Sequence, residues 1–232
     1  EGTLIALKTK LKPGVEGIDI YGRQLLSGKT PVDCDFKIGN NIRIIETDNE
    51  IEFFAEKTGV LTFSESFIGI DESLHIKGDI DAKTGNIHFS KDITIDGNIT
   101  SGFTVECGSK LIIKGNIEKG STVISKKDLK VLHGIFGEET KVSVTEGNAE
   151  IGFIQNSSIN VNGNLTIHDF SFLSNVFAKG EIKVLGKKNT GSNSCVVGGR
   201  LNSLGSMDLS SAGSTASKTE LFCGFNAEVV EK

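Results

Sequence analysis

The chain has 232 residues, of which 37% are hydrophobic and 24% are charged, with a formal net charge of −5. That length suits one elongated domain with a smaller attachment, or two compact domains. The acidic balance and the scarcity of arginine argue against a nucleic-acid surface, because such surfaces neutralise many phosphates. No apolar run approaches the roughly 18 residues of a membrane-spanning helix, so we expect no membrane span.

The chain begins with Glu1 and not with a methionine, so we expect a piece of a longer protein. Its cysteines are spread out: Cys34, Cys107, Cys195 and Cys223. They form no CxxC pair, which argues against a zinc knuckle or a dithiol redox motif. Reduced cysteines are typical of cytoplasmic proteins, so we expect a cytoplasmic location.

Residues 1–70 contain short apolar stretches separated by glycine and asparagine turns, as in Lys12 to Gly22. We expect a small β-rich domain here. It would pack on the first coil of the repeat that follows and cover an open sheet end.

A repeat of about 18 residues begins after residue 70. Its clearest copies read LHIKGDI from Leu74, ITIDGNI from Ile93, LIIKGNI from Leu111 and INVNGNL from Ile159. A longer apolar ladder keeps the same spacing: Ile87, Val105, Val123, Val142, Ile159 and Val176. A period of 2 within strands and of 18 between them is typical of a parallel β-solenoid. We therefore predict an all-β parallel β-helix of about seven coils over residues 71–205.

The handedness of the coil has two interpretations. Apolar residues recur every six positions from Ile87 to Ile135, which also fits left-handed hexapeptide helices. Those helices favour a small residue after each apolar position, but here large ones occur: His88, Glu106, Ile112, Glu118, Lys130 and Phe136. We therefore predict the right-handed form, in line with the general preference of parallel crossovers.

Glycines recur at the bends of the repeat: Gly97, Gly115 and Gly163. We expect sharp bends there that favour a positive φ. Asp79, Asn98 and Asn116 follow the glycines of their coils. Their side chains either form a hydrogen-bonded ladder between coils or each suit their own turn.

The C-terminal flank departs from the repeat. The stretch from Lys187 to Gly199 lacks the GxxxxGK[ST] pattern of a phosphate-binding loop, so we interpret it as a plain loop. Residues 206–232 are predicted to cap the solenoid. Because both ends carry extra sequence, we expect no end-to-end filament. We expect a monomer or a weak homodimer through an outer face, since charged residues there mix with Ile112.

A carbohydrate-active enzyme, such as a β-helical polysaccharide lyase or hydrolase, is the alternative function. Its candidate groups are acidic residues that lie close in sequence: Asp71, Asp79, Asp81, Asp92 and Asp96. Paired carboxylates perform acid–base chemistry or hold calcium. Sugar sites also use aromatic platforms, but the chain has no tryptophan and a single tyrosine, Tyr21. We interpret these carboxylates as solvated surface and turn residues.

Histidine and cysteine give no stronger signal. The histidines are His75, His88, His133 and His168, and none lies in an HxH or HxxxH spacing. Cys107 occupies an inward ladder position, where a thiol behaves as a small hydrophobe. We therefore predict no catalytic, cofactor-binding or metal-binding residue, and a structural or scaffold role.

Three segments together resemble the flagellar assembly protein A family. They are PGVEGIDIYG from Pro13, GDIDAKTGNIHFSKDITIDGNITSGFTVECGSKLIIKGNI from Gly78 and SAGSTASKTELFCG from Ser211. The resemblance implies a right-handed parallel β-helix like those of MinC and the bactofilins. It also implies a bacterial cytoplasmic scaffold, with protein partners in flagellar assembly or polar localisation and no catalytic residues. A bactofilin-like or MinC-like cytoskeletal or cell-division module is a second alternative.

Overall fold

A computed structural model gives the fold of the chain. It describes residues 1–12, 14–26, 32–33, 37–65, 67–186 and 195–224. The chain falls into two compact units, Glu1–Glu72 and Ser73–Lys232, and each is described by itself. Strands but no helix occur among the described residues, which confirms the all-β prediction.

The first unit holds three small sheets. An antiparallel sheet has the order β1-β6-β5, a hairpin pairs β2 with β3, and a third sheet has the order β4-β8-β7. Phe53, Ala55, Ile68 and Ile70 are its buried apolar residues. The strand bounds are β1 (Leu4–Thr9), β2 (Gly17–Ile18), β3 (Gln24–Leu25), β4 (Lys37–Ile38), β5 (Ile42–Glu46), β6 (Glu50–Ala55), β7 (Val60–Ser64) and β8 (Phe67–Asp71).

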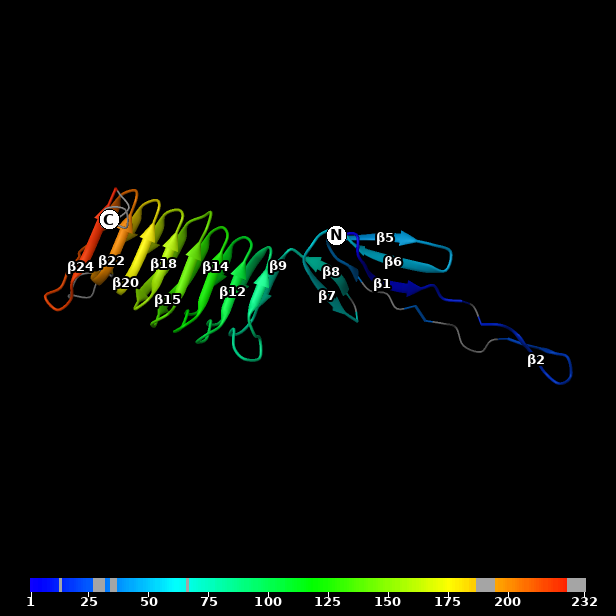
Figure 1. Cartoon of the computed structure of the whole chain (residues 1–232). Helices are drawn as coiled ribbons and strands as arrows, with labels where there is room; N and C mark the ends of the chain where they lie inside the picture. The colour runs from blue at the N-terminus through cyan, green and yellow to red at the C-terminus, as the bar shows by residue number, and fades with distance from the viewer. Residues whose placement is uncertain (13, 27–31, 34–36, 66, 187–194, 225–232) are drawn as a thin grey trace. The chain divides into compact units, whose positions relative to one another are not determined.

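The second unit is a parallel β-solenoid of about eight coils, stacked from β9 to β24 (Figure 1). Each strand pairs in parallel with the equivalent strand of the next coil. The strand bounds are β9 (Ser73–Ile76), β10 (Ile87–Phe89), β11 (Asp92–Ile95), β12 (Thr104–Cys107), β13 (Leu111–Ile113), β14 (Thr122–Ser125), β15 (Leu129–Phe136), β16 (Lys141–Val144), β17 (Ala149–Gln155), β18 (Ser158–Val161), β19 (Leu165–Ile167), β20 (Ser171–Ala178), β21 (Ile182–Val184), β22 (Val196–Ser203), β23 (Met207–Leu209) and β24 (Thr219–Cys223).

Every coil has three sides, which we name in chain order. Side A begins the coil with β9 and its counterparts up to β23. Side B is short and begins as single bridged residues: Ile80, Ile99, Ile117 and Ile135. It continues through Ile154, Ser171 and Val196. Side C ends the coil with β10 and its counterparts up to β24.

The strands pair in the register that the predicted apolar ladder indicates. Ile87 pairs with Val105, Val105 with Val123, and Val123 with Val142. On side A, Ile95 pairs with Ile113 in the same manner. These inward side chains form one continuous core, in which most are completely buried. The predicted solenoid with an apolar interior is therefore confirmed, while its handedness stays a prediction.

The solenoid continues past residue 205, where the sequence predicts a cap to begin. β23 pairs with β21, and β24 pairs with β22, both in parallel. Met207 and Leu209 pack against the core at inward positions. Residues 207–223 therefore form an eighth coil, and a capping role for this region stays a prediction.

The glycines at the bends have a role that differs from our prediction. Gly97 and Gly115 form a column at the bend after side A, and Gly163 lies at another bend, between β18 of side C and β19 of side A. Gly97, Gly115 and Gly163 do not have a positive φ. Each approaches the backbone of the preceding coil so closely that a side chain would collide with it. A Cβ on Gly115 would lie 2.6 Å from the carbonyl carbon of Gly97. The column thus sets how tightly the coils stack at this bend.

Polar residues beside these glycines form ladders, which decides between the two interpretations of these turns. The Asp79 carboxylate accepts a bond from the Asn98 backbone N–H at 2.6 Å, and the Asn98 side chain accepts one from Asn116 N–H at 2.8 Å. Asp128, Asn148 and Asn164 repeat the arrangement at the bend between side C and side A, with N···O distances of 2.9 Å. Each side-chain oxygen therefore satisfies a turn N–H of the next coil.

The glycine column supplies a matched test. Replacing Gly115 with alanine should lower the free energy of unfolding by about 1–3 kcal/mol, the usual cost of overpacking. Gly78 begins the same column, and a Cβ there would meet nothing within 4 Å. Gly78→Ala should therefore stay within about 0.5 kcal/mol of the parent. Urea denaturation of both variants measures this, and equal losses would contradict the close-approach explanation.

Candidate functional site

Side A carries two networks in which one carboxylate contacts a lysine and a histidine from the two neighbouring coils. Asp96 lies 2.8 Å from Lys114 Nζ and 2.9 Å from His75 Nε2. Glu150 lies 2.8 Å from both Lys130 Nζ and His168 Nε2. The lysine and then the histidine hold the pKa of each carboxyl below its usual range. Both carboxylates thus stay ionised and link three coils.

The other predicted acidic residues have structural partners too. Asp81 accepts bonds from the backbone N–H groups of its own turn, which lower its pKa. Asp92 accepts the Lys110 N–H at 3.1 Å. Asp79 starts an asparagine ladder, and Asp71 accepts a bond from Thr62 at 3.1 Å in the first unit. Each of these four carboxylates is therefore held by hydrogen bonds to its own turn, to a neighbouring strand or to the next coil.

The histidines are not brought together. His75 and His168 belong to the networks above, and His88 Nδ1 lies 2.7 Å from Glu106 of the next coil. Exposed His133 joins none of these pairs. Within the described parts of the chain, no group of three or more His, Cys, Asp or Glu residues is placed to hold a metal ion.

The described cysteines are all free thiols. Cys107 is buried, and this burial raises its thiol pKa, which disfavours the reactive thiolate. Its Sγ donates to the carbonyls of Lys91 and Lys110 at the bend. Cys195 is buried and Cys223 is exposed. Cys34 and residues 187–194 of the predicted loop lie outside the described residues.

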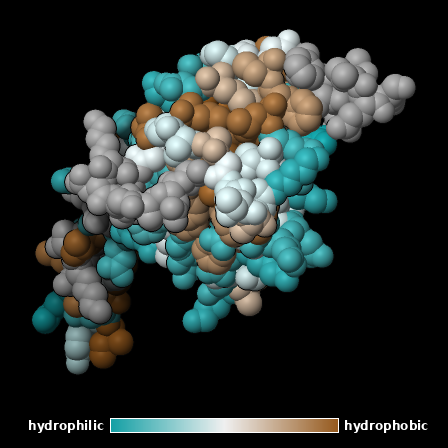
Figure 2. Space-filling view, turned by 90° about the vertical axis from the view of Figure 1, so that its left-hand side faces the viewer, coloured by the Kyte–Doolittle hydropathy of each residue, from teal (hydrophilic) through white to brown (hydrophobic). Residues whose placement is uncertain are grey.

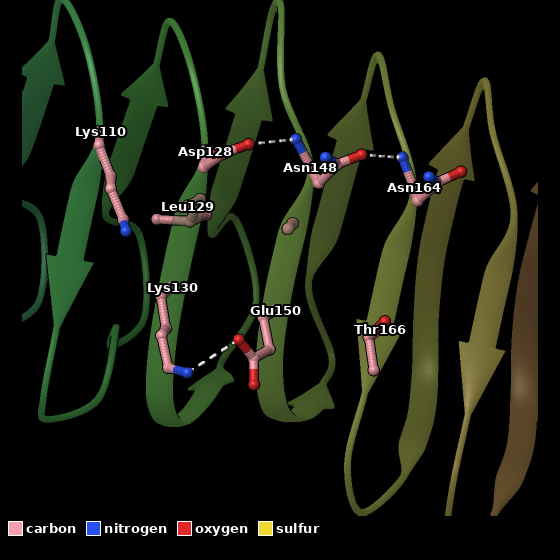
Figure 3. A pocket seen from close by; sticks show the side chains of 9 residues that line it. Lys110, Asp128, Leu129, Lys130, Asn148, Glu150, Asn164 and Thr166 are labelled. Carbon is pink, nitrogen blue, oxygen red and sulfur yellow. Dashed lines mark hydrogen bonds and ion pairs between the residues drawn. The ribbon is translucent and has the colours of Figure 1, made fainter.

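A hollow of about 540 Å³ lies on side A across β13 to β19. Its polar lining is largely bonded within itself (Figure 3): Asp128, Asn148 and Asn164 form the ladder, and Lys130 pairs with Glu150. Each of these bonds joins one coil to the next. Five of the polar residues that line the hollow are therefore bonded to one another across the coils.

A second hollow, of about 940 Å³, lies on side C between β18 and β24. Glu220 pairs in it with Arg200 at 3.1 Å and with Lys218 at 2.5 Å. The two cations, first Lys218 and then Arg200, lower the pKa of Glu220. Buried Asn202 also lines the hollow, and its side-chain oxygen has no hydrogen-bond partner in the described structure.

The hairpin of β2 and β3 exposes apolar side chains that sequence reasoning did not single out. Ile20 is 91% exposed and Tyr21 is 77% exposed. Asp19 fixes the turn by accepting the backbone N–H groups of Tyr21 and Arg23 at 2.9 and 2.8 Å. In the sequence, the signal for this surface was the cluster of apolar residues in GIDIYG. The paired strands here are only two residues long, so they cannot bury these side chains. Exposed Tyr and Ile on an ordered turn suit contacts with other proteins.

Apolar surface is also visible on the solenoid. Seen from the β24 end, hydrophobic residues form a band among hydrophilic ones (Figure 2). Several large side chains of the later coils are exposed: Leu132, Phe170, Leu173, Leu185, Leu204 and Leu221. Contiguous apolar surface of this kind is typical of interaction sites.

Comparison with family models decides the relationship of the chain. Residues 72–232 match the flagellar assembly protein A beta solenoid domain, and residues 1–66 match the flagellar assembly protein A N-terminal region. The chain belongs to the flagellar assembly protein A family. No curated protein and no solved structure gave a match. The two matched regions agree with the two structural units, which divide between Glu72 and Ser73. Over the described residues, there is no helix of the length and apolar character needed to cross a bilayer.

The Glu150 network predicts a pH dependence. A carboxyl with a folded-state pKa below its usual 4.5 stabilises the fold above that value, and this contribution is lost as the pH falls through the folded-state pKa. The variant Glu150→Gln should therefore be less stable than the parent at pH 7, and it should lose less of its stability than the parent as the pH falls. Glu146, whose nearest cation Lys126 is 3.7 Å away, provides the control variant Glu146→Gln. Urea midpoints from pH 7 to acid measure the effect, and parallel curves for parent and Glu150→Gln would contradict it.

Proposed function

We propose that this protein is a non-catalytic scaffold of the bacterial cytoplasm that supports flagellar assembly, or the polar placement of its machinery, through protein–protein contacts. The observation that carries the proposal is that both structural units match the flagellar assembly protein A family. A flagellar role comes from this family membership, and a scaffold role also fits the arrangement of the outer side chains.

The arrangement of polar groups supports a role without catalysis. Asp79, Asp96 and Glu150 bind neighbouring coils, so their position follows from stacking. A catalytic carboxylate needs room for substrate beside it and a pKa near the operating pH. Asp96 and Glu150 instead have lowered pKa values. The exposed apolar side chains, such as Tyr21 and Leu173, offer contact surface for partners.

Genetic complementation tests the proposal. In a flagellated bacterium that carries this gene, its deletion should reduce the number or polar placement of flagella, counted by electron microscopy. The parent gene and a doubly substituted Asp96→Asn, Glu150→Gln gene should both restore them, because a scaffold needs the fold and not the carboxylates. Substituting Tyr21 with serine should restore them less well.

Two results would count against the scaffold role. One is normal flagellation in the deletion strain. The other is loss of function in the doubly substituted protein while its circular dichroism stays that of the parent, together with turnover of anionic polysaccharides by the purified parent. The second result would favour the carbohydrate-active alternative.

A further inference from the structure

Side B changes its character along the solenoid. The outward residue next to each inward bridge is polar in the first three coils: Asp81, Thr100 and Glu118. In coils four to seven the same column reads Phe136, Gln155, Phe172 and Val197, which pair in register. The inward column of Ile135, Ile154, Ser171 and Val196 stays buried through this change, so the burial of the core does not require the outer residues to become apolar.

The neighbouring bend becomes apolar over the same coils. The asparagine ladder ends where the Asn116 side chain accepts the Gly134 N–H at 3.2 Å. Phe153 and Phe170 then replace it, with their rings stacked 5.1 Å apart. Together with the apolar members of the outer column, which Gln155 interrupts, these rings form an apolar surface that we call the side B patch: Phe136, Phe153, Phe170, Phe172, Leu173 and Val197. Phe170 and Leu173 are exposed, and the other four are half-buried.

Leu173 is the residue in the patch that the fold explains least. It has a φ of 47°, and it lies between Asn156 at 50° and Gly198 at 67° in the equivalent bends of the adjacent coils. Asn and Gly suit this left-handed conformation, whereas leucine is strained in it. The side chain is also 44% exposed. A strained and exposed leucine lowers stability without filling the core, which points to a role in contact with another molecule.

The end of the patch nearest the third coil is acidic. Glu118, Glu138 and Glu139 lie there, and Glu138 lies 3.8 Å from Lys119. Glu139 is exposed and has no ion-pair partner among the described residues. A partner that covers the apolar residues would therefore gain from basic residues at this end.

The backbone of these coils restricts how a partner can bind. An extended peptide adds to a sheet through a free edge. In coils four to seven, each side B segment already pairs with a coil on both sides, so no free edge is available there. The outer column spans three coil spacings of about 4.8 Å, or about 14 Å. About ten residues of an α-helix have that length.

We infer that the side B patch binds an amphipathic α-helix of a partner protein, with an apolar stripe over Phe172 and Leu173 and basic residues facing Glu138 and Glu139. The inference rests on the proposed function as a contact-forming scaffold and names the chemistry of one contact. The strain at Leu173 is then the cost of presenting an apolar side chain at the centre of that contact.

Synthetic helices test this with the full chain. Three labelled peptides of about 18 residues share one leucine stripe and carry lysine and arginine, glutamate, or serine and glutamine on their flanks. Fluorescence anisotropy should show the basic peptide binding about tenfold or more tightly than the acidic one. Leu173→Asn should weaken the binding of the basic peptide about tenfold. It should leave the melting temperature of the protein equal or higher, because asparagine fits the bend. Leu204→Asn, which changes an exposed leucine outside the patch, should alter neither.

Charge reversal provides the second arm. The double variant Glu138→Lys, Glu139→Lys should favour the acidic peptide over the basic one. Equal affinity for all three peptides, no binding, or a lower melting temperature for Leu173→Asn would overturn the inference. So would sedimentation showing that Leu173→Asn abolishes self-association of the parent, since the occupant would then be a second copy. These readouts use purified protein, so their failure leaves the flagellar test in cells standing.

Discussion

The spacing between successive coils is the constraint on which the rest of the solenoid depends. Parallel pairing holds equivalent strands about 4.8 Å apart, so whatever occupies a position in one coil must fit directly against its counterpart in the next. The interior meets this condition with stacked isoleucine, leucine and valine. The bend after side A meets it with glycine, because a Cβ on Gly97 or Gly115 would collide with the preceding coil.

The same spacing explains most of the polar surface. Side chains one coil apart are close enough for ion pairs and amide ladders, so the carboxylates of Asp96 and Glu150 have partners in both neighbouring coils. This is why three of the acidic residues that lie close in the sequence, Asp79, Asp92 and Asp96, form bonds between coils. Two apolar surfaces remain exposed beside these contacts: the β2–β3 hairpin in the first unit and the side B patch in the second.

Much of the fold was predictable because every coil repeats nearly the same spacing of apolar residues. The ladders beginning at Ile87 and Ile93 predicted the observed registers, since one strand period and one coil period suffice to align them. The role of Gly97 was not predictable, because a glycine required by close approach and a glycine required by a positive φ look the same in a sequence. The eighth coil was missed because the polar stretch between Leu209 and Thr219 breaks the period, although inward residues resume at Leu221.

The contact surfaces were harder to predict for a related reason. Side B contributes one inward residue per coil, so its outer column has no strand alternation that distinguishes Phe136 and Phe172 from core residues. The conformation of Leu173 is likewise a property of the bend and not of the residue type. The stacking of the coils brings these side chains together on one outer surface.

Amide hydrogen exchange of the turn residues tests the stacking account most directly. Asn116 and Asn164 lie in turns, and their backbone N–H groups are bonded to side chains of the preceding coil. The account predicts that these amides exchange as slowly as those of the core strands, because opening them requires separating two coils. Exchange as fast as in the exposed hairpin turn around Tyr21 would contradict it.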